Sequence, residues 1–599
     1  MYRAPLQDLK FALEEVLGLE ALAECPDFSD VTPELAESVL QEAARLAEGV
    51  LDPLYAPADR EGAHWSDDGV ATPKGFKAAY QQFVSGGWPQ LRAAPAFGGQ
   101  GMPAVLVAAV EELFASANLA FRLCPMLTQG ATEAIAHCGS AAQKELYLPP
   151  MVRGEWTGTM NLTEPQAGSD LSQVRTRAVP QGNHYRIFGQ KIFITYGEHD
   201  LAANIIHLVL ARIEGAPAGV RGISLFIVPK FLVGEDGSVG ARNDLMCVSI
   251  EHKLGIRGSP TCTMIYGQGD GAVGYLLGEA NRGLEYMFIM MNAARLSVGL
   301  EGYAVAERAY QRALDWARNR VQGRPPGPTE DHTVRPITHH PDVRRMLLTM
   351  KSQIEAMRYL TLYTAIQLDL GAHHGDLSRR LPSRARGELL IPIVKGWCTE
   401  TGVELASLGI QVHGGMGYIE ETGAAQALRD ARISTIYEGT TGIQAGDLIG
   451  RKLARDGGAA FASLAADIHA ELASYRDAAG AAEPAAPPIV AAADAALVRL
   501  EDVVANLLGN PSGSPAAAAA VAVPLLRLAG ITFGGWLQAR AAVRASILAS
   551  RAGADGRFLQ AKLQTARFYA EQILPLTVGL SMIVREGAGS VLESDPELL

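Results

Sequence analysis

The stretch Ser434-Thr435-Ile436-Tyr437-Glu438-Gly439-Thr440-Thr441 places a carboxylate between an aromatic ring and a glycine, with two hydroxyl side chains directly after it. The residues before Glu438 are mostly β-branched or aromatic, and Gly439 permits a backbone turn that a side chain would obstruct. A glutamate beside apolar neighbours loses hydration, which raises its pKa toward the range useful to a general base. The stretch therefore indicates a catalytic glutamate, although an ordinary surface turn with a solvated Glu438 fits the same residues.

The chain around this stretch is long and acidic. Its 599 residues exceed the size at which one hydrophobic core stops growing, so several domains are expected. The formal net charge of -12 argues against a general nucleic-acid binder. From Arg451 onward, 13 Lys or Arg residues face 14 Asp or Glu residues, so the last part of the chain is nearly neutral.

The cysteines and the N-terminus indicate the compartment. The six cysteines are scattered and no two have CxxC spacing, which is typical of a reduced intracellular protein without a metal site or disulfide framework: Cys25, Cys124, Cys138, Cys247, Cys262 and Cys398. The first residues lack the apolar core of a signal peptide. We find no run of about 18 uncharged apolar residues that fits a membrane span. A cytoplasmic protein without a stable membrane span is expected.

Hydrophobic periodicity predicts an α+β multidomain protein. Helical spacing predominates in the first part, as from Ala104 to Leu119, and returns at about Gly283, with Pro341 suited to open a later helix. Between them lie short β-prone segments with turn signals, at residues 157–163, 185–188, 191–195, 205–210 and 223–228. The expected order is an N-terminal helical domain, a middle antiparallel β-barrel or sandwich, a helical bundle with the Glu438 stretch, and an additional C-terminal helical domain, at residues 1–155, 156–282, 283–455 and 456–599. Asp477 to Ala496 is rich in Ala and Pro and is interpreted as a linker.

One arginine interrupts an apolar stripe. Arg295 lies on the same expected helix face as Leu284, Phe288, Met291 and Val298. A guanidinium on a buried face is costly unless it has a partner. Arg295 therefore either faces a cavity with a polar ligand or the catalytic carboxylate, or it forms a structural ion pair or reaches solvent along the surface.

Several motifs occur where the helical and β regions alternate. Together they resemble the acyl-CoA dehydrogenase family over about residues 85–450: Asn161 to Asp170, Gln190 to Thr195, Gln411 to Tyr418, Arg429 to Arg432, and Tyr437 to Thr440. The length and the additional C-terminal domain look most like the large subgroup of that family, which includes broad-chain fatty acyl-CoA and methylthiopropanoyl-CoA dehydrogenases.

The resemblance implies FAD, bound between the β domain and the second helical domain. It implies that the β-domain residues lining the flavin and acyl-CoA are Met160, Leu162, Thr163, Gly168, Ser169, Phe193 and Thr195. Thr440 would reach the adenosine part of the cofactor. The residues that would approach the FAD of a neighbouring subunit are Arg320, Gln322, Gln411, Gly414 and Gly415. A cofactor shared across a subunit boundary implies a homo-oligomer, with a dimer favoured over a tetramer.

Three details of the expected site stay open. The family often has Trp where this chain has Phe193, which keeps the apolar face but lacks the indole N–H donor. The Phe-Gly pair that many relatives have after the arginine is absent, so the role of Gln322 is uncertain. Ser169 either bonds the flavin or the pantetheine arm of the substrate, or caps the backbone beside Asp170.

The resemblance also implies a reaction. Glu438 would remove a proton from the carbon next to the thioester while a hydride leaves the adjacent carbon for the flavin, giving a trans-2-enoyl-CoA. The backbone N–H of Glu438 would stabilise the developing enolate-like charge at the thioester oxygen. Tyr437, Gly439, Ser169 and Arg295 would line the substrate. An electron-transfer flavoprotein is the expected acceptor, and fatty acid β-oxidation the expected setting.

Two other functions share these sequence features. An acyl-CoA oxidase would keep the fold and pass the electrons to oxygen. A DNA-associated flavoprotein of the alkylation response would use a basic C-terminal domain, which the near-neutral charge after Arg451 disfavours. Acyl-chain length also stays open, because short thioether, medium and long chains all fit what the sequence indicates. Pocket depth is expected to depend on Pro95 to Met102 and on the helix from Leu284.

Overall fold

The structure is a computed structural model that describes residues 1–326, 334–479, 486–509, 514–551, 553 and 555–598. Contacts between residues divide the chain into two compact units. Unit 1 comprises Met1–Ala44, Pro103–Ser116 and Val298–Leu599, and unit 2 comprises Arg45–Met102 and Ala117–Ser297. Helices α5 (Ala104–Cys138) and α7 (Gly283–Asn319) contribute residues to both. The division into four consecutive domains stays a prediction.

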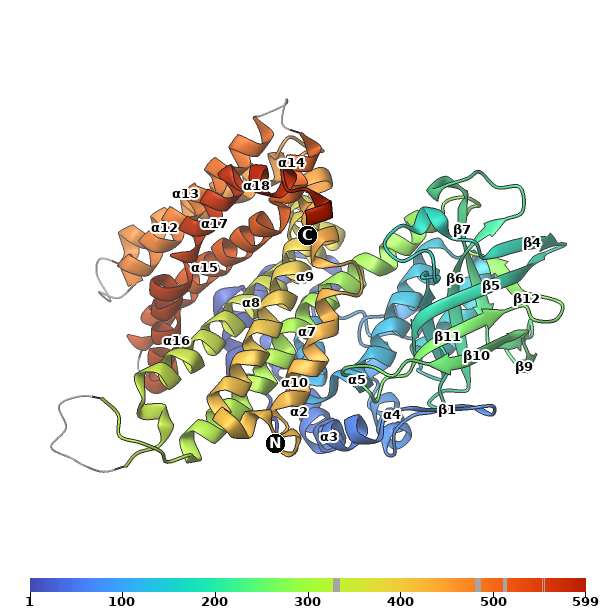
Figure 1. Ribbon diagram of the computed structural model, residues 1–599, viewed down its shortest axis with the longest axis horizontal. Helices are drawn as coiled ribbons and strands as arrows, with labels where there is room; N and C mark the ends of the chain where they lie inside the picture. Colours follow the sequence, from blue (N-terminus) through green and yellow to red (C-terminus); the bar gives the residue numbers. More distant parts are fainter. Residues whose placement is uncertain (327–333, 480–485, 510–513, 552, 554, 599) are drawn as a thin grey trace. The chain divides into compact units, whose positions relative to one another are not determined.

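Unit 1 is helical (Figure 1). Its N-terminal helices are α1 (Leu6–Lys10), continued by a turn of wider helix at Phe11–Val16, and α2 (Pro33–Leu46). The central helices are α8 (Pro341–His373), α9 (Leu377–His413), α10 (Ala424–Ala431) and α11 (Thr441–Asp447). The C-terminal helices are α12 (Ala459–Ala479), α13 (Ala486–Leu508), α14 (Pro515–Ala520), α15 (Ala522–Ala549), α16 (Gly556–Phe568), α17 (Leu576–Glu586) and α18 (Ala588–Leu592).

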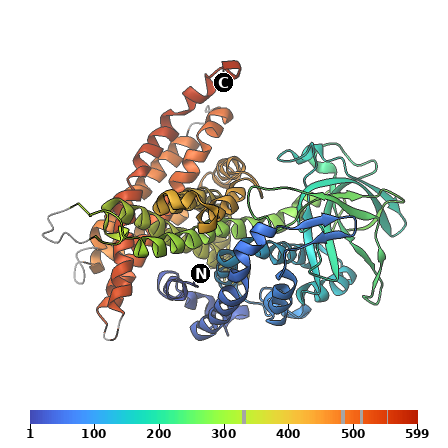
Figure 2. The same ribbon diagram turned by 60° about the horizontal axis from the view of Figure 1, so that its bottom comes forward.

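Helix α15 is the centre of the C-terminal part of unit 1. It contacts α13, α16 and α17 as well as α8 and α9. Figure 2 shows the orange and red C-terminal helices side by side. A helix that is apolar all round is expected to be buried, and most of α15 from Leu525 to Ser546 is buried. The contact with α9 is close, because a Cβ at Gly530 would lie 2.2 Å from Cγ of Trp397.

The linker predicted for Asp477 to Ala496 is wrong for its second half. Residues from Ala486 onward form α13, and its first turn contains Pro487 and Pro488. Proline is tolerated in the first turn of a helix, because the N–H groups there have no partner within the helix. The six residues 480–485 lie outside the described residues.

Unit 2 contains the sheet predicted for the middle of the chain (Figure 1). Its strands are β3 (Trp156–Asn161), β4 (Arg177–Gln181), β5 (His184–Thr195), β6 (Asn204–Ile213), β7 (Ile223–Pro229), β10 (Leu245–Ile250), β11 (Thr261–Tyr266) and β12 (Ala272–Leu276). Strands β8 (Phe231–Val233) and β9 (Val239–Arg242) pair separately. The helices of unit 2 are α3 (Asp52–Glu61), α4 (Phe76–Ser85) and α6 (Ala141–Val152), together with the parts of α5 and α7 noted above.

The pairing of these strands differs from a purely antiparallel sheet. Strand β6 pairs in parallel with β3 and with β4, while the other pairs of the sheet are antiparallel. A parallel pair needs a long connection rather than a hairpin, and local turn signals do not reveal it. Sequence patterns predicted β3, β5, β6 and β7 and missed the others, as well as the hairpin of β1 (His64–Ser66) and β2 (Gly69–Ala71) in the N-terminal region.

The described residues include one helix, α5, that is long and apolar enough to cross a membrane. The apolar window of this helix is 94% buried inside the protein, and the core helices of globular proteins pass the same test. The run expected for a membrane span is uncharged, whereas α5 contains Glu111, Glu112 and Arg122. The sequence pattern predicted helix only from Ala104 to Leu119. The helix continues past a kink at Asn118, whose φ of -159° is not helical.

Candidate active site

The Glu438 stretch forms a tight loop between α10 and α11 in unit 1. Glu438 has a φ of +54° and Gly439 a φ of +88°, so two consecutive residues are left-handed. A Cβ at Gly439 would lie 2.8 Å from Nε2 of Gln444, which leaves little space for a side chain. The positive φ also favours glycine at this position. The glycine-bounded turn predicted from the sequence is present, and Glu438 within it is half-buried.

Buried polar side chains contact this loop from three helices. The Tyr437 hydroxyl donates to the carboxylate of Glu301 on α7, and Nζ of Lys395 on α9 lies 2.6 Å from the Gly439 carbonyl oxygen. Nε2 of Gln444 on α11 donates to the Glu438 carbonyl oxygen at 3.1 Å. The Thr440 hydroxyl caps α11 by accepting from the backbone N–H of Ile443. The Tyr437 side chain and the carbonyl oxygens of Glu438 and Gly439 are therefore held from inside the protein.

In unit 2, Phe193 occupies an unusual position on β5. Its φ is +59° and its side chain is 58% exposed, although it is a large apolar residue in a long strand. The pairing with β11 shifts register here, since Cys262 faces Ile194 while Met264 faces Lys191. A β-bulge re-aims side chains, and a bulky residue with positive φ is rare without a functional reason. The bulge therefore turns the Phe193 ring outward.

A buried ion pair between Lys191 and Glu164 holds the loop that follows β3. Nζ of Lys191 lies 2.8 Å from the Glu164 carboxylate and 2.9 Å from the Leu162 carbonyl oxygen. Glu164 also accepts from the backbone N–H groups of Arg175 and Thr176. Burial by itself raises the pKa of Glu164, but Lys191 and the hydrogen bonds outweigh burial and lower that pKa to about 2. Burial lowers the pKa of Lys191 to about 8, so both groups are ionised at pH 7.

The other β-domain residues named from the sequence lie around this pair. Met160 is the next-to-last residue of β3 and is buried, Leu162, Thr163 and Thr195 are half-buried, and Gly168 and Ser169 are exposed. The backbone N–H of Ile192 donates to the Thr163 carbonyl oxygen, which brings this loop next to β5. The carboxylate of Asp170 caps the short turn that follows by accepting from Ser172, so the capping role considered for Ser169 belongs to Asp170.

Arg295 is buried on α7, with an exposed fraction of 3%. Its guanidinium lies 5.9 Å from the Phe288 ring centroid, and Nη1 lies 3.4 Å from Oδ1 of Asn292. The possibility that Arg295 reaches solvent along the surface is therefore wrong. Its assignment to the substrate site stays a prediction.

The residues expected to approach a neighbouring FAD lie on the surface of unit 1. The exposed set is Arg320, Gln322, Gln411, Gly414 and Gly415. Nη2 of Arg320 donates to Oε1 of Gln322 at 3.2 Å. Tyr418, directly after the glycines, is 88% exposed, and Met416 and Ile419 are also exposed apolar residues. These residues are available to a partner rather than to the interior of unit 1.

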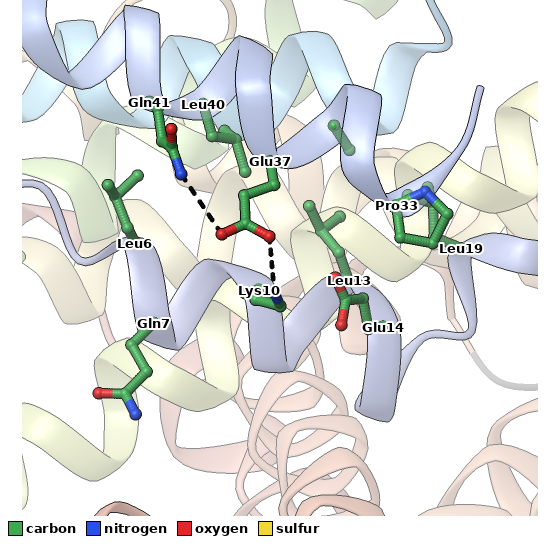
Figure 3. A pocket seen from close by; sticks show the side chains of 11 residues that line it. Leu6, Gln7, Lys10, Leu13, Glu14, Leu19, Pro33, Glu37, Leu40 and Gln41 are labelled. Carbon is green, nitrogen blue, oxygen red and sulfur yellow. Dashed lines mark hydrogen bonds and ion pairs between the residues drawn. The ribbon is translucent and has the colours of Figure 1, made fainter.

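A separate hollow with a volume of about 210 Å³ lies among the N-terminal helices of unit 1 (Figure 3). Figure 3 shows that Lys10 points to Glu37 across it, at 2.6 Å, and that Gln41 donates to the same carboxylate. Its apolar lining comes from Leu6, Leu13, Leu19, Pro33, Ala36 and Leu40. No residue of the Glu438 loop lines it, so this hollow is not the active site.

Comparison with protein-family models identifies the chain. Four models match in succession: the acyl-CoA dehydrogenase N-terminal domain at residues 33–155, middle domain at 159–268 and C-terminal domain at 281–454, and a model described as "Acetyl-CoA dehydrogenase C-terminal like" at 464–595. The chain belongs to the acyl-CoA dehydrogenase family. The resemblance inferred from the sequence motifs is thereby confirmed, including the additional C-terminal domain.

Individual relatives extend over nearly the whole chain. The 3-methylmercaptopropionyl-CoA dehydrogenase of Ruegeria pomeroyi is 49% identical over 96% of this chain and 96% of its own. The broad-specificity linear acyl-CoA dehydrogenase FadE5 of Mycobacterium tuberculosis is 36% identical over 99% of each chain. Among solved structures, Caenorhabditis elegans ACDH-11 in complex with C11-CoA covers 100% of this chain and 96% of its own with a TM-score of 0.73; at 20% identity it supports the fold alone.

The protein is therefore an oxidoreductase of a FAD-dependent family that acts on acyl-CoA substrates. Four buried charged residues of the candidate site were missed from the sequence: Glu164, Lys191, Glu301 and Lys395. A signal for Lys395 was present, because it is the single charge in the run Ile391-Pro392-Ile393-Val394-Lys395-Gly396-Trp397. A buried ammonium in such a run needs a specific partner.

Proposed function

We propose that this acyl-CoA dehydrogenase desaturates a short thioether acyl-CoA of the 3-methylmercaptopropionyl type, with Glu438 as the base. The observation that carries the role of Glu438 is its loop: a half-buried carboxylate in a left-handed backbone, next to a glycine and anchored from three helices. Strained backbone held in place by surrounding contacts is typical of catalytic positions.

The proposed substrate class rests on the Ruegeria pomeroyi relative. That protein is 49% identical over 96% of both chains, whereas FadE5, with a linear acyl-CoA preference, is 36% identical over 99% of both. Linear acyl chains are therefore the second candidate. Both candidates share the thioester and the α and β carbons on which the reaction occurs.

The chemistry requires removal of a weakly acidic proton next to the thioester carbonyl. The Glu438 carboxylate takes this α proton, and the backbone N–H of Glu438 donates to the thioester oxygen as negative charge develops there. The further substrate contacts that we propose are Tyr437 and Gly439 in unit 1 and Ser169 and Arg295 in unit 2. FAD, when bound, supplies the acceptor for the hydride that leaves the β carbon.

The residues of unit 2 fit a flavin. An exposed aromatic ring that a bulge turns outward, Phe193, is suited to pack on a planar ring system. Thr195 follows Phe193 by two residues on β5, and the Thr163 carbonyl oxygen accepts from the backbone N–H of Ile192, next to Phe193. Both threonines are half-buried, and their hydroxyls would donate to ring heteroatoms. The remaining cofactor contacts proposed on this unit are Met160, Leu162, Gly168 and Ser169, with Thr440 reaching the adenosine part.

We further propose a homodimer in which the exposed residues Arg320, Gln322, Gln411, Gly414 and Gly415 contact the FAD of the partner. The exposed apolar side chains of Met416, Tyr418 and Ile419 support an interface there.

An electron-transfer flavoprotein as acceptor, a cytoplasmic location and a place in β-oxidation belong to the same proposal. The succession of family-model matches supports four domains, and the circuit of pairings β5–β4–β6–β7–β12–β5 supports a barrel in the middle one.

The proposal is tested with an acyl-CoA panel under anaerobic conditions, following loss of flavin absorbance. A short thioether acyl-CoA is expected to reduce the flavin with the highest kcat/KM, and butyryl-, octanoyl- and palmitoyl-CoA serve as linear comparisons. A preference for a linear chain would overturn the substrate class and leave the dehydrogenase. Peroxide formed stoichiometrically with product in air, without added acceptor, would instead favour an oxidase.

A further inference from the structure

The conformation of the catalytic loop is unfavourable by itself. A non-glycine residue at φ of +54° followed by a glycine at +88° is not a state that a short loop maintains alone. The loop must therefore be held by its surroundings. Two of the groups that hold it are buried polar side chains to which the reaction described above assigns no task, Lys395 and Glu301.

Lys395 contacts the loop directly after the base. Its side chain has an exposed fraction of 0%, and its Nζ lies 2.6 Å from the carbonyl oxygen of Gly439. A buried ammonium group is costly unless its N–H donors are used. One of these donors is used on the peptide between Gly439 and Thr440, where the chain leaves the left-handed conformation.

Glu301 contacts the loop directly before the base. It too has an exposed fraction of 0%, and its carboxylate accepts a hydrogen bond from the Tyr437 hydroxyl. The two side chains therefore reach the residues on either side of Glu438 from two different helices, α7 and α9.

The crossing of these helices explains how both side chains reach one loop. A Cβ at Gly302 would lie 2.3 Å from the Cys398 carbonyl oxygen, and a Cβ at Gly402 would lie 2.3 Å from the Gly302 carbonyl oxygen. Only glycine permits this close approach of α7 and α9. The glycines thus bring Glu301 and Lys395, each within a turn or two of the crossing, under the Tyr437 to Gly439 loop.

We propose that Lys395 and Glu301 are positioning residues of the reaction, a two-point clamp that keeps the Glu438 carboxylate in its productive direction. The inference rests on the proposed role of Glu438 as base. Neither residue removes the proton. Lys395 acts through the carbonyl group of Gly439 and Glu301 through the side-chain hydroxyl of Tyr437, so loss of either one displaces the base without removing it.

A control variant distinguishes the effect of the clamp on catalysis from the effect that loss of any buried charged side chain has on stability. Lys562 on α16 supplies a matched control in the same unit, because its side chain is 1% exposed and ion-paired with Glu355 at 2.9 Å. Lys562→Met removes a buried ammonium without altering the catalytic loop. A merely structural role of Lys395 predicts the same behaviour for Lys395→Met as for Lys562→Met.

The test measures proton removal separately from hydride transfer. Acetyl-CoA has α protons but no β carbon, so exchange of its α protons in D₂O by the FAD-loaded enzyme reports on the base alone. Flavin reduction by a reactive acyl-CoA, substrate KM and melting temperature are measured on the same variants. Lys395→Met and Glu301→Leu break the clamp, and Lys395→Arg and Glu301→Gln keep a donor and an acceptor.

We expect Lys395→Met and Glu301→Leu to lower both the exchange rate and kcat by about 10²-fold or more, with KM changed by less than about threefold. Glu301→Gln should recover to within about tenfold of the parent protein, and Lys562→Met should lower the melting temperature while kcat stays within about threefold. If Lys395→Met does not fold, the Glu301→Leu and Glu301→Gln pair decides.

Two results would overturn the inference, and they differ. If Glu438→Gln abolishes exchange while the clamp variants exchange as the parent protein does, the clamp is wrong and the base assignment stands. If Glu438→Gln itself exchanges normally, the base assignment fails and the clamp fails with it.

Discussion

Glu438 is held in a backbone conformation that costs about 1–2 kcal/mol for an L-residue other than glycine. Phe193 in unit 2 is held in a similar one. Two residues on which the proposed chemistry depends are therefore strained, and the groups that restrain Glu438 are buried side chains distant in the sequence. The strain is expected to be part of how each side chain is aimed.

Replacing Glu438 with Gln removes the base and keeps the size of the side chain. Desaturation should fall by about 10²–10⁴-fold from the loss of general-base catalysis, with further loss from altered positioning. FAD content and melting temperature should match those of the parent protein. The assay is acyl-CoA turnover with an artificial electron acceptor, and near-normal turnover would end the assignment of Glu438.

Replacing Arg295 with Ala tests whether this buried guanidinium serves the substrate. We expect kcat/KM to fall by about tenfold or more, since a charged hydrogen-bond donor in a water-poor site contributes about 1.5–3 kcal/mol. Steady-state kinetics and thermal melting measure the two effects. The control is Arg186→Ala on β5, whose guanidinium donates to the Gly271 carbonyl oxygen.

A different outcome for Arg295→Ala would show that the residue does not serve the substrate. If Arg295→Ala lowers the melting temperature strongly and leaves kcat/KM intact, the residue is structural. The contacts with Phe288 and Asn292 would then account for its burial.

At the scale of elements, glycines and bulges decide where side chains point. The α7–α9 crossing depends on Gly302 and Gly402, and the outward direction of Phe193 depends on the register shift between β5 and β11. Neither the helix crossing nor the register shift has a local signal in the sequence, because each depends on contact between segments that lie far apart along the chain.

Helices α12 and α13 share a histidine that makes their contact depend on pH. Nδ1 of His469 lies 2.7 Å from Asp494, and Nε2 lies 2.7 Å from Glu501. Burial alone lowers the pKa of His469, but hydrogen bonds to the two carboxylates outweigh burial, so the pKa is raised. Arg476 also pairs with Asp494. The folded protein therefore binds this proton more tightly than the unfolded chain does.

A raised pKa gives stability that is complete below the unfolded value of about 6.5 and is lost as the pH rises through the folded value. The contribution should be small, about 0.2–1 kcal/mol, because the group is partly exposed. Thermal melts of the parent protein and of His469→Gln at pH 5.5 and pH 8.5 measure it. Their difference in melting temperature should shrink at the higher pH, and a difference independent of pH would contradict this assignment.

At the scale of the molecule, the C-terminal helices are part of the core of unit 1. Lys562 on α16 pairs with Glu355 of α8 and with Asp8 of α1, and Arg540 on α15 pairs with Glu471 at 2.5 Å and donates to the Val16 carbonyl oxygen. The Trp397 side chain of α9 packs against Gly530. The N-terminal, central and C-terminal helices are thus joined by buried polar and apolar contacts.

Deletion of residues 456–599 should therefore prevent stable folding rather than release an independent module. It would expose Trp397 and the buried faces of α8 and α9 that α15 and α16 cover, and it would remove Lys562 from Glu355, which keeps Lys351 as a partner. Soluble yield, FAD content and cooperativity of thermal unfolding are the measurements. The control is removal of the residues from 593 onward, of which 593–598 are exposed. A soluble, flavin-loaded truncation with the melting temperature of the full chain would contradict the expectation.

Much of the organisation was accessible from the sequence because it is local. Helical periodicity, Pro341 at the start of α8, and Gly439 after Glu438 each depend on neighbours within a few residues. The end of α5, the extent of α13 and the parallel pairing of β3 with β6 were missed, since contacts with distant segments override local preferences there.

By itself the sequence determined the family, the helix–β–helix order and the candidate base Glu438, because motif residues and periodic apolar positions are written along the chain. Only the tertiary structure decided that Phe193 turns outward on a bulge, and that Lys395 and Glu301 lie beneath the Glu438 loop. Those placements depend on how closely backbones approach one another, and a glycine such as Gly302 reveals its role only once the second helix is beside it.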